Sequence, residues 1–188
     1  MNPVYRLQRC FWDVEKLRAE SIAVKEIAYK IPYTYKGKPY GHIVALPFKE
    51  YQPELTPELT KFRSSFLETY PAIPSERGLV GWGDITTAYM WIEADYPWHT
   101  DNKVTTSQYT GKGVNCALNV LLDGAEAAVE YNINGQISSH LYESAVLNTS
   151  ELHRVNPVGQ RVMARISFKD KTFKEAVKGL ESWQEKNI

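Results

Sequence analysis

The amino-acid sequence predicts one mainly β domain with flanking helices. Its 188 residues fit a single domain, and a hydrophobic fraction of 43% is large enough to form a sizeable core. No internal repeat, low-complexity tract or linker divides the chain. Strand-like patterns recur along residues 79–168, and many short strands in succession are typical of a β-sandwich or a barrel.

Two helices are expected in the N-terminal part of the chain. Asp13 is a suitable N-cap, and Thr56-Pro57-Glu58 provides a cap, a first-turn proline and an acidic residue. Each is followed by apolar residues at helical spacing, which are Leu17, Ile22, Val24 and Ile27 in the first case and Leu59, Phe62, Phe66 and Tyr70 in the second. Between them, the prolines and glycines of residues 31–51 predict short extended pieces joined by turns.

The expected strands comprise residues 85–93, 114–122, 127–133, 136–142, 144–148 and 161–168. Asn134-Gly135 separates two of them and is the preferred pair for a type I′ hairpin, because both central residues of that turn need a positive φ.

These patterns divide the single domain of residues 1–188 into three parts. We expect a helical or irregular flank over residues 1–78, a β core over residues 79–168, and a C-terminal helix within residues 169–188. That helix is predicted over residues 170–186, and its apolar stripe consists of Phe173, Ala176, Val177, Leu180 and Trp183.

The charge balance disfavours binding to nucleic acid. The 22 basic residues equal the 22 acidic residues, so no chain-wide positive field exists to attract phosphates. Binding to nucleic acid remains an alternative because of a local basic group near the C-terminus. This group consists of Arg161, Arg165, Lys169, Lys171, Lys174 and Lys178.

A membrane or secreted protein is not expected. Charged residues interrupt the first twenty positions, so no signal-peptide core is visible, and residues 114–122 are too short to cross a bilayer. Cys10 and Cys116 lie far apart without a Cys-x-x-Cys partner, which is typical of a reducing compartment. We expect a cytoplasmic location.

A metal site is predicted from His99, Asp101 and His153. His99 and Asp101 are two positions apart after a predicted strand, so their side chains project to the same side. His153 follows another strand and supplies a third ligand. Two imidazoles and one carboxylate form the facial triad of non-haem Fe(II) oxygenases. A lone His-x-Asp is more often a pair of hydrogen-bonding turn residues, so this motif alone is weak.

The residues after His153 strengthen the prediction. In order, His99, Asp101, His153, Arg165 and Ser167 resemble the signature of the 2-oxoglutarate and Fe(II)-dependent dioxygenases, over roughly residues 80–168. The resemblance implies a double-stranded β-helix core, which is a cupin-like jelly roll. It also implies Fe(II) and 2-oxoglutarate as cofactors, O₂ as cosubstrate, and hydroxylation of a substrate as the reaction.

Two arginines compete as the anchor for 2-oxoglutarate. Arg165 lies twelve positions after His153, a little more than is usual in the family, and Arg161 lies eight positions after it, a little less. Alternation places both arginines on one face of their strand, and a guanidinium binds a carboxylate bidentately. We favour Arg165 because Ser167 completes an Arg-x-Ser motif. An exposed strand face bearing both arginines is the alternative.

Two further residues are candidates for the cosubstrate pocket. Tyr89 belongs to the strand that leads to His99, and its phenol could bind a carboxylate of 2-oxoglutarate, although packing in the core is an equal explanation. Asn119 interrupts an apolar strand, where a buried amide needs polar partners. It is either a structural residue or a support for the site.

The sequence leaves the substrate unnamed, and a small molecule or an amino-acid side chain suits the chain best. Two other functions remain open. A cupin-like metal protein acting as an isomerase or hydrolase would need His99, Asp101 and His153 without Arg165 and Ser167. A non-enzymatic β-sandwich binding module would need none of them.

Overall fold

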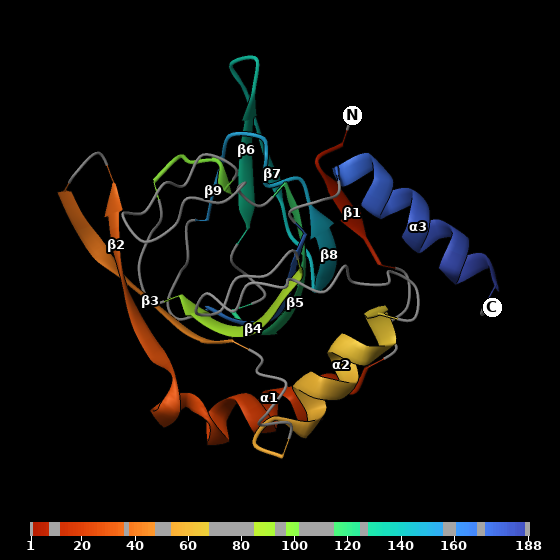
Figure 1. Cartoon of the computed structure of the whole chain (residues 1–188). Helices are drawn as coiled ribbons and strands as arrows, with labels where there is room; N and C mark the ends of the chain where they lie inside the picture. Colours follow the sequence, from red (N-terminus) through yellow and green to blue (C-terminus); the bar gives the residue numbers. More distant parts are fainter. Residues whose placement is uncertain are drawn as a thin grey trace.

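The structure is a computed structural model and describes residues 2–7, 12–35, 38–47, 54–67, 85–92, 97–101, 115–124, 128–155, 161–168 and 172–186. Its elements, in chain order, are β1 (Val4–Arg6), α1 (Val14–Ala23), the 3-10 helix η1 (Lys25–Ile27), β2 (Tyr29–Tyr35), β3 (Lys38–Pro47), α2 (Pro57–Leu67), β4 (Ile85–Ile92), β5 (Cys116–Asp123), β6 (Val129–Ile133), β7 (Gln136–His140), β8 (Ser144–Leu147), β9 (His153–Val155), β10 (Arg161–Phe168) and α3 (Phe173–Lys186) (Figure 1).

The strands form two antiparallel sheets, as a mainly β fold requires. The main sheet has seven strands in the order β1-β8-β5-β10-β4-β3-β2, and the minor sheet has three in the order β7-β6-β9. Strand β10 lies in the middle of the main sheet, between β5 and β4. Residues on β10 therefore have neighbours on both sides, which suits a strand that carries functional side chains.

The hairpin between β6 and β7 is confirmed. Asn134 has a φ of 53° and Gly135 a φ of 82°, so both central residues adopt the positive φ that a type I′ turn needs. The turn fixes the register of the minor sheet, in which Tyr131 lies opposite Ser138.

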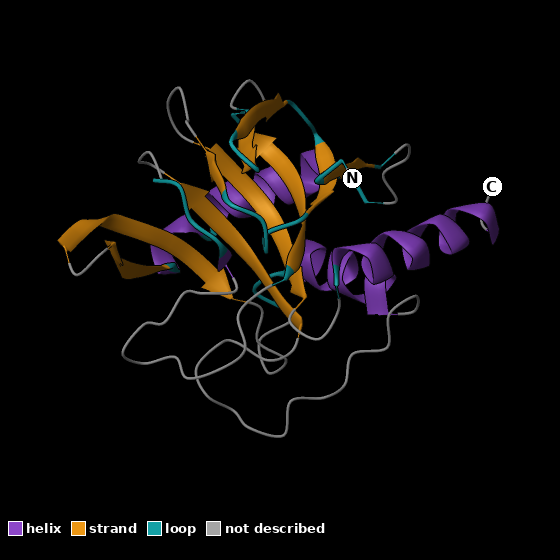
Figure 2. Ribbon diagram, turned by 90° about the horizontal axis from the view of Figure 1, so that it is seen from above, coloured by secondary structure: helices purple, strands orange, loops and turns teal. Residues whose placement is uncertain are grey.

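The main sheet is covered on both faces. One face packs against the minor sheet, and this core contains Ala88, Met90, Leu121, Val129, Tyr131, Ala145, Leu147 and Met163. The other face packs against the helices, in a core that contains Leu17, Leu59, Phe62, Tyr89, Trp91, Leu118, Val120, Ile166, Phe168, Phe173, Ala176 and Leu180. Figure 2 shows the helices on one side of the strands. We call the first face inner and the second face outer.

The three predicted α-helices are present with small differences. The side chain of Asp13 accepts a hydrogen bond from the Lys16 amide and so caps α1, as expected. Ile22 and Ile27, expected on the buried side of the first helical segment, are exposed. The C-terminal helix begins at Phe173 because Thr172 and Glu175 form a capping box there. No helix in the described part of the chain is long and apolar enough to span a membrane.

The prediction of a helical or irregular flank over residues 1–78 is wrong in one respect. This part of the chain also supplies β1, β2 and β3 to the main sheet. The prolines of residues 31–51 suggested breaks between short pieces. Pro32 instead lies on β2, the edge strand, where a missing backbone N–H costs no hydrogen bond to a further strand. The resulting hairpin of β2 and β3 extends the sheet beyond β4.

Candidate metal centre

His99, Asp101 and His153 converge beside β9 of the minor sheet. Nε2 of His99 lies 3.3 Å from Oδ1 of Asp101, and Nε2 of His153 lies 3.7 Å from the same oxygen. One ligand atom from each residue lies within 4.8 Å of the others. Three residues separated in sequence by up to 54 positions thus present a compact set of nitrogen and oxygen ligands.

Backbone hydrogen bonds hold the two histidines beside each other. The amide of His99 donates to the carbonyl of His153, and the amide of His153 donates to the carbonyl of His99, both at 2.9 Å. This antiparallel bridge joins the His99 segment to β9. The amide of Asp101 donates to the carbonyl of Thr149 at 2.9 Å and fixes the carboxylate on the same side.

The tautomer of each imidazole is set by a backbone carbonyl. Nδ1 of His99 lies 2.7 Å from the carbonyl oxygen of Pro97, and Nδ1 of His153 lies 2.8 Å from that of Glu151. A carbonyl oxygen only accepts hydrogen bonds, so both Nδ1 atoms carry a hydrogen. In the neutral ring this leaves the lone pair on Nε2, the atom that faces Asp101.

Asp101 is ionised despite being buried. Burial opposes its charge, but the Arg165 guanidinium, the hydrogen bond with His99 and the two imidazoles together hold its pKa well below the usual range. Burial lowers the pKa of His153 below its ordinary value. Burial also acts to lower the pKa of His99, but Asp101 raises it overall, because its charged carboxylate accepts a hydrogen bond from Nε2 of His99 when the ring is protonated. An ionised carboxylate and a neutral His153 are the forms that bind a metal.

Arg165 and Ser167 lie on the inner face of β10, as predicted, because they are paired with Ala88 and Thr86 of β4. Nε of Arg165 donates to Oγ of Ser167 at 2.9 Å, and Nη2 donates to Oδ2 of Asp101 at 2.5 Å. The two carboxylate oxygens of Asp101 therefore have different neighbours: Oδ2 bonds to Arg165, and Oδ1 faces the imidazoles.

Arg161 lies further along the same inner face and is fully buried. Its Nη2 donates to the hydroxyl of Tyr142, and its guanidinium lies over the Tyr142 ring, 5.0 Å from the centroid. Nδ2 of Asn119 donates to that hydroxyl at 3.1 Å, so Asn119 also belongs to this group. Oδ1 of Asn119 makes no hydrogen bond to any described residue. The alternative that Arg161 and Arg165 form an exposed strand face is wrong, because Arg161 is fully buried and the Arg165 side chain is only 15% exposed.

Tyr131 and Tyr142 are site residues that the sequence analysis missed. The Tyr131 ring lies 5.7 Å from the ring of His153, and its hydroxyl is buried without a hydrogen-bond partner in the described part of the chain. Burial and then the neighbouring Tyr142 and Asp101 raise the pKa of Tyr131. The alternation of apolar and polar residues along β6 points Tyr131 inward, but nothing singles out Tyr142 among twelve tyrosines.

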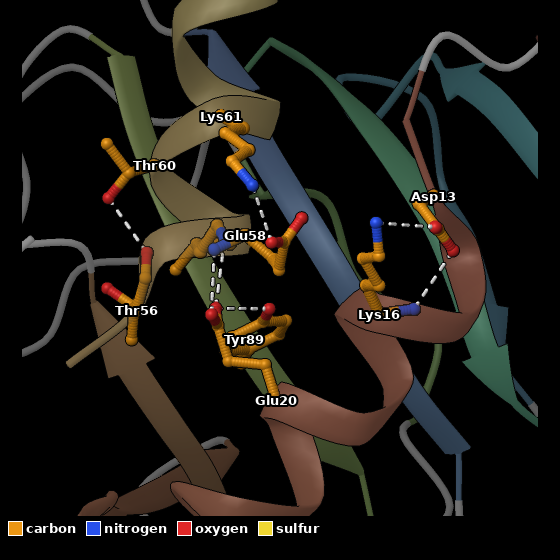
Figure 3. A network of polar contacts seen from close by, with 9 residues as sticks. Asp13, Lys16, Glu20, Thr56, Glu58, Thr60, Lys61 and Tyr89 are labelled. Atoms are coloured by element: carbon orange, nitrogen blue, oxygen red, sulfur yellow. Dashed lines mark hydrogen bonds and ion pairs between the residues drawn. The ribbon is translucent and has the colours of Figure 1, made fainter. Parts of the chain in front are cut away.

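Tyr89 does not belong to the site. It is paired with Ala164, on the outer face of β4, and its hydroxyl donates to Oε1 of Glu20 at 2.7 Å (Figure 3). The Glu20 carboxylate also accepts the amides of Glu58 and Leu59 at the start of α2. The alternation of side chains correctly predicts which residues of β4 share a face, but it does not show which face meets the pocket.

The triad fits a non-haem iron ion. Two imidazole nitrogens and one carboxylate oxygen face a common point, each imidazole is oriented by a carbonyl, and the carboxylate is oriented by an arginine. Three protein ligands leave coordination positions for other molecules. Structural zinc sites, by contrast, are usually closed by four protein ligands.

No family model and no curated protein matches the sequence. The fold is similar to that of a prolyl-4-hydroxylase from Pseudomonas putida, with a TM-score of 0.56, 15% identity, and coverage of 90% of this chain and 93% of the other. It is also similar to HygX from Streptomyces hygroscopicus, solved with nickel and 2-oxoglutarate, with a TM-score of 0.51, 12% identity, and coverage of 90% and 83%. These similarities confirm the predicted fold, a double-stranded β-helix or cupin-like jelly roll.

Proposed function

We propose that the protein is an Fe(II)- and 2-oxoglutarate-dependent dioxygenase that hydroxylates a small molecule or an amino-acid side chain. The observation that carries this proposal is the convergence of His99, Asp101 and His153 beside the inward-facing arginines of β10. A metal triad alone would also suit a cupin-like isomerase or hydrolase. The buried Arg161, on the same inner face of β10, is the cation that the distal carboxylate of 2-oxoglutarate requires.

Fe(II) would be held by Nε2 of His99, Nε2 of His153 and Oδ1 of Asp101. When bound, Fe(II) and 2-oxoglutarate supply the oxidising chemistry: O₂ is consumed, 2-oxoglutarate is cleaved to succinate and CO₂, and one oxygen atom enters the substrate as a hydroxyl group. The protein supplies the ligand geometry. The carbonyls of Pro97 and Glu151 keep the imidazoles in the tautomer that leaves Nε2 available.

The distal carboxylate of 2-oxoglutarate would be bound by Arg161 and Tyr142. Arg161 is fully buried, and a charge-assisted hydrogen bond is strong where water is excluded. The Tyr142 hydroxyl, already in contact with Arg161, supplies a second donor once it rotates toward an anion. This assignment differs from the preference that the Arg-x-Ser motif gave to Arg165.

Arg165 orients Asp101 instead. Its guanidinium is bonded to Oδ2 of Asp101 at 2.5 Å and to Ser167, so it is held against a metal ligand. An arginine in this position keeps the carboxylate ionised and turns Oδ1 toward the imidazoles. Ser167 in turn fixes the direction of the Arg165 side chain.

Apolar side chains of both sheets keep the inner space dry. Met90, Leu121, Ala145 and Met163 of the main sheet face Val129 of the minor sheet, and all five are buried. A low-dielectric surrounding strengthens the ion pair between the cosubstrate and Arg161.

The substrate and the cellular location are further parts of the proposal. Similarity to a prolyl-4-hydroxylase makes proline, free or in a peptide, the first substrate to test. We place the protein in the cytoplasm, because Cys10 and Cys116 lie far apart in the sequence without a Cys-x-x-Cys partner and Fe(II) is maintained under reducing conditions.

Formation of succinate from 2-oxoglutarate tests the proposal. The protein of residues 1–188, loaded with Fe(II) and ascorbate in air, should release succinate slowly without substrate and faster with a true substrate. The Asp101→Ala variant should release none. A folded wild-type protein that binds iron through the triad but neither binds nor consumes 2-oxoglutarate would move the assignment to the cupin-like alternative.

A further inference from the structure

Two parallel rows of side chains cross the minor sheet at the metal centre. The bridge between His99 and His153 sets the register, so that Trp98 lies opposite Arg154, and β6 places Tyr131 opposite His153 and Glu130 opposite Arg154. Because side chains alternate between faces, the rows face opposite ways. The inner row lies on the face of the minor sheet that bears the metal centre and consists of His99, His153 and Tyr131. The outer row lies on the opposite face of the minor sheet and consists of Trp98, Arg154 and Glu130.

The outer row is joined by direct contacts. The guanidinium of Arg154 lies over the Trp98 ring, 4.7 Å from its centroid, in a cation–π arrangement. Nε of Arg154 donates to Oε2 of Glu130 at 2.6 Å. Glu130 is 21% exposed and Arg154 37% exposed, so the ion pair is only partly screened by water. Arg154 thus links the His99 segment to the centre of the minor sheet.

Among the described residues, backbone hydrogen bonds join the His99 segment to the rest of the fold only at the bridge to His153 and from the Asp101 amide to the carbonyl of Thr149. Its pairing with β9 is an isolated bridge, in which His99 and His153 exchange both of their hydrogen bonds. In an antiparallel pair, the positions next to such an exchange have no hydrogen bond between them, and their side chains lie closer together. Trp98 and Arg154 occupy these positions, so their side chains supply the attachment that the backbone lacks there.

We propose that the outer row positions His99 for metal binding. This inference rests on the proposed function, because it requires that His99 is a metal ligand. Nε2 of His99 must meet an ion that His153 and Asp101 also hold, and a small shift of the His99 segment along β9 would remove it from that point. The stack of Trp98 on Arg154 opposes such a shift, and Glu130 holds Arg154 in place.

Titration of the metal-free protein of residues 1–188 with CoCl₂ under anaerobic conditions tests the inference without relying on turnover. The visible absorption of Co(II) reports its ligand set, and the titration reports its affinity. We expect Arg154→Ala to weaken binding by roughly 10-fold, the lower end of what supporting residues of metal sites contribute. His99→Ala serves as the reference for loss of a ligand.

Arg18→Ala is the matched control. Arg18 also forms an ion pair, with Glu15 at 2.7 Å, and is exposed to a similar extent, 44%, but lies on α1 at the outer face. It should leave the Co(II) affinity and spectrum unchanged. Equal affinities for Arg154→Ala and wild type would overturn the inference while leaving the metal centre intact. Co(II) binding that does not depend on His99 would overturn the metal centre itself.

A pair of substitutions at Trp98 tests the ring contact and covers the case in which Arg154→Ala fails to fold. Trp98→Phe and Trp98→Leu both remove the indole, but only phenylalanine keeps an aromatic face under the guanidinium. Trp98→Phe should bind Co(II) nearly as well as wild type, and Trp98→Leu should bind several-fold more weakly. Indistinguishable affinities of these two variants would contradict the role given to the stack.

Discussion

Two buried or half-buried carboxylates, Glu20 and Asp101, lie on opposite faces of the main sheet and have different surroundings. Glu20 accepts hydrogen bonds from two backbone amides of α2 and from the Tyr89 hydroxyl, at 2.7–2.9 Å (Figure 3). Asp101 accepts one from Arg165 through Oδ2, while Oδ1 faces the Nε2 atoms of His99 and His153. Both groups are polar and rich in contacts, so polarity alone does not identify the functional one.

The two carboxylates differ in the chemistry of the atoms that surround them. All three groups around Glu20 are hydrogen-bond donors, two of them fixed in the backbone, so they satisfy the carboxylate and join α1, α2 and β4. The Nε2 atoms around Oδ1 of Asp101 are lone-pair donors to a metal when the imidazoles are neutral. A carboxylate satisfied by donors is structural, whereas one that faces other ligand atoms indicates a metal site.

Loss of Asp101 should have the largest effect. Asp101→Ala removes one ligand and leaves Arg165 without its carboxylate, so we expect metal affinity to fall more than about 100-fold, beyond what a supporting residue contributes. Turnover should be lost with it. The measurements are Co(II) titration and succinate release, with circular dichroism as the control for folding. An active, iron-replete Asp101→Ala variant would remove the triad from the account.

The two arginines of β10 should separate into two roles. Arg161→Gln should weaken 2-oxoglutarate binding by about 10- to 100-fold, because it removes a buried charge-assisted hydrogen bond, and should leave Co(II) affinity near wild type. Arg165→Gln should mainly weaken Co(II) binding, through Asp101. Calorimetric titrations of both variants with each ligand would show this crossed pattern. The reverse pattern would restore Arg165 as the anchor.

Loss of Glu20 should affect stability and not the metal centre. Glu20→Ala leaves the first amides of α2 and the Tyr89 hydroxyl without their acceptor, so we expect a loss of about 1–3 kcal/mol in the free energy of unfolding. At this chain length each kcal/mol corresponds to about 2–4 °C in the melting midpoint. Thermal melting measures the effect. A changed Co(II) affinity would show that the two faces are coupled.

Tyr89→Phe should have the smallest effect. It removes one of the three hydrogen bonds to Glu20, worth about 1 kcal/mol, and keeps the ring that packs beside Trp91. Because the hydroxyl lies on the outer face, 2-oxoglutarate affinity should equal that of wild type. A measurable weakening of 2-oxoglutarate binding would return Tyr89 to the pocket.

The triad residues were predictable because local sequence carries most of the information. His99 and Asp101 are two positions apart, and strand geometry alone puts them on one side. Alternation likewise placed Arg161, Arg165 and Ser167 on one face of β10, and Asn134-Gly135 fixed the hairpin. His153 was proposed as the third ligand from its place just after another strand, and the family resemblance strengthened that prediction, since no local rule brings a residue 54 positions away into contact with His99.

What the sequence did not predict depends on long-range packing. Alternation along β4 has two solutions, and only the position of α1 and α2 shows that Tyr89 faces the helices. Pro32 suggested a break between strands, because a sheet tolerates a proline mainly in an edge strand and the sequence does not show that β2 is one. The contacts of Tyr142 with Arg161 and of Arg154 with Trp98 join separate segments whose register no sequence pattern defines.

The most direct test of the central claim is an anaerobic titration of the metal-free protein with Fe(II) and 2-oxoglutarate, in wild type and in His153→Ala. Chelation of Fe(II) by the keto acid produces a weak visible charge-transfer band. We predict the band in wild type and its absence in a folded His153→Ala variant. No band in folded wild-type protein, or an equal band in both proteins, would contradict the proposed cofactor site.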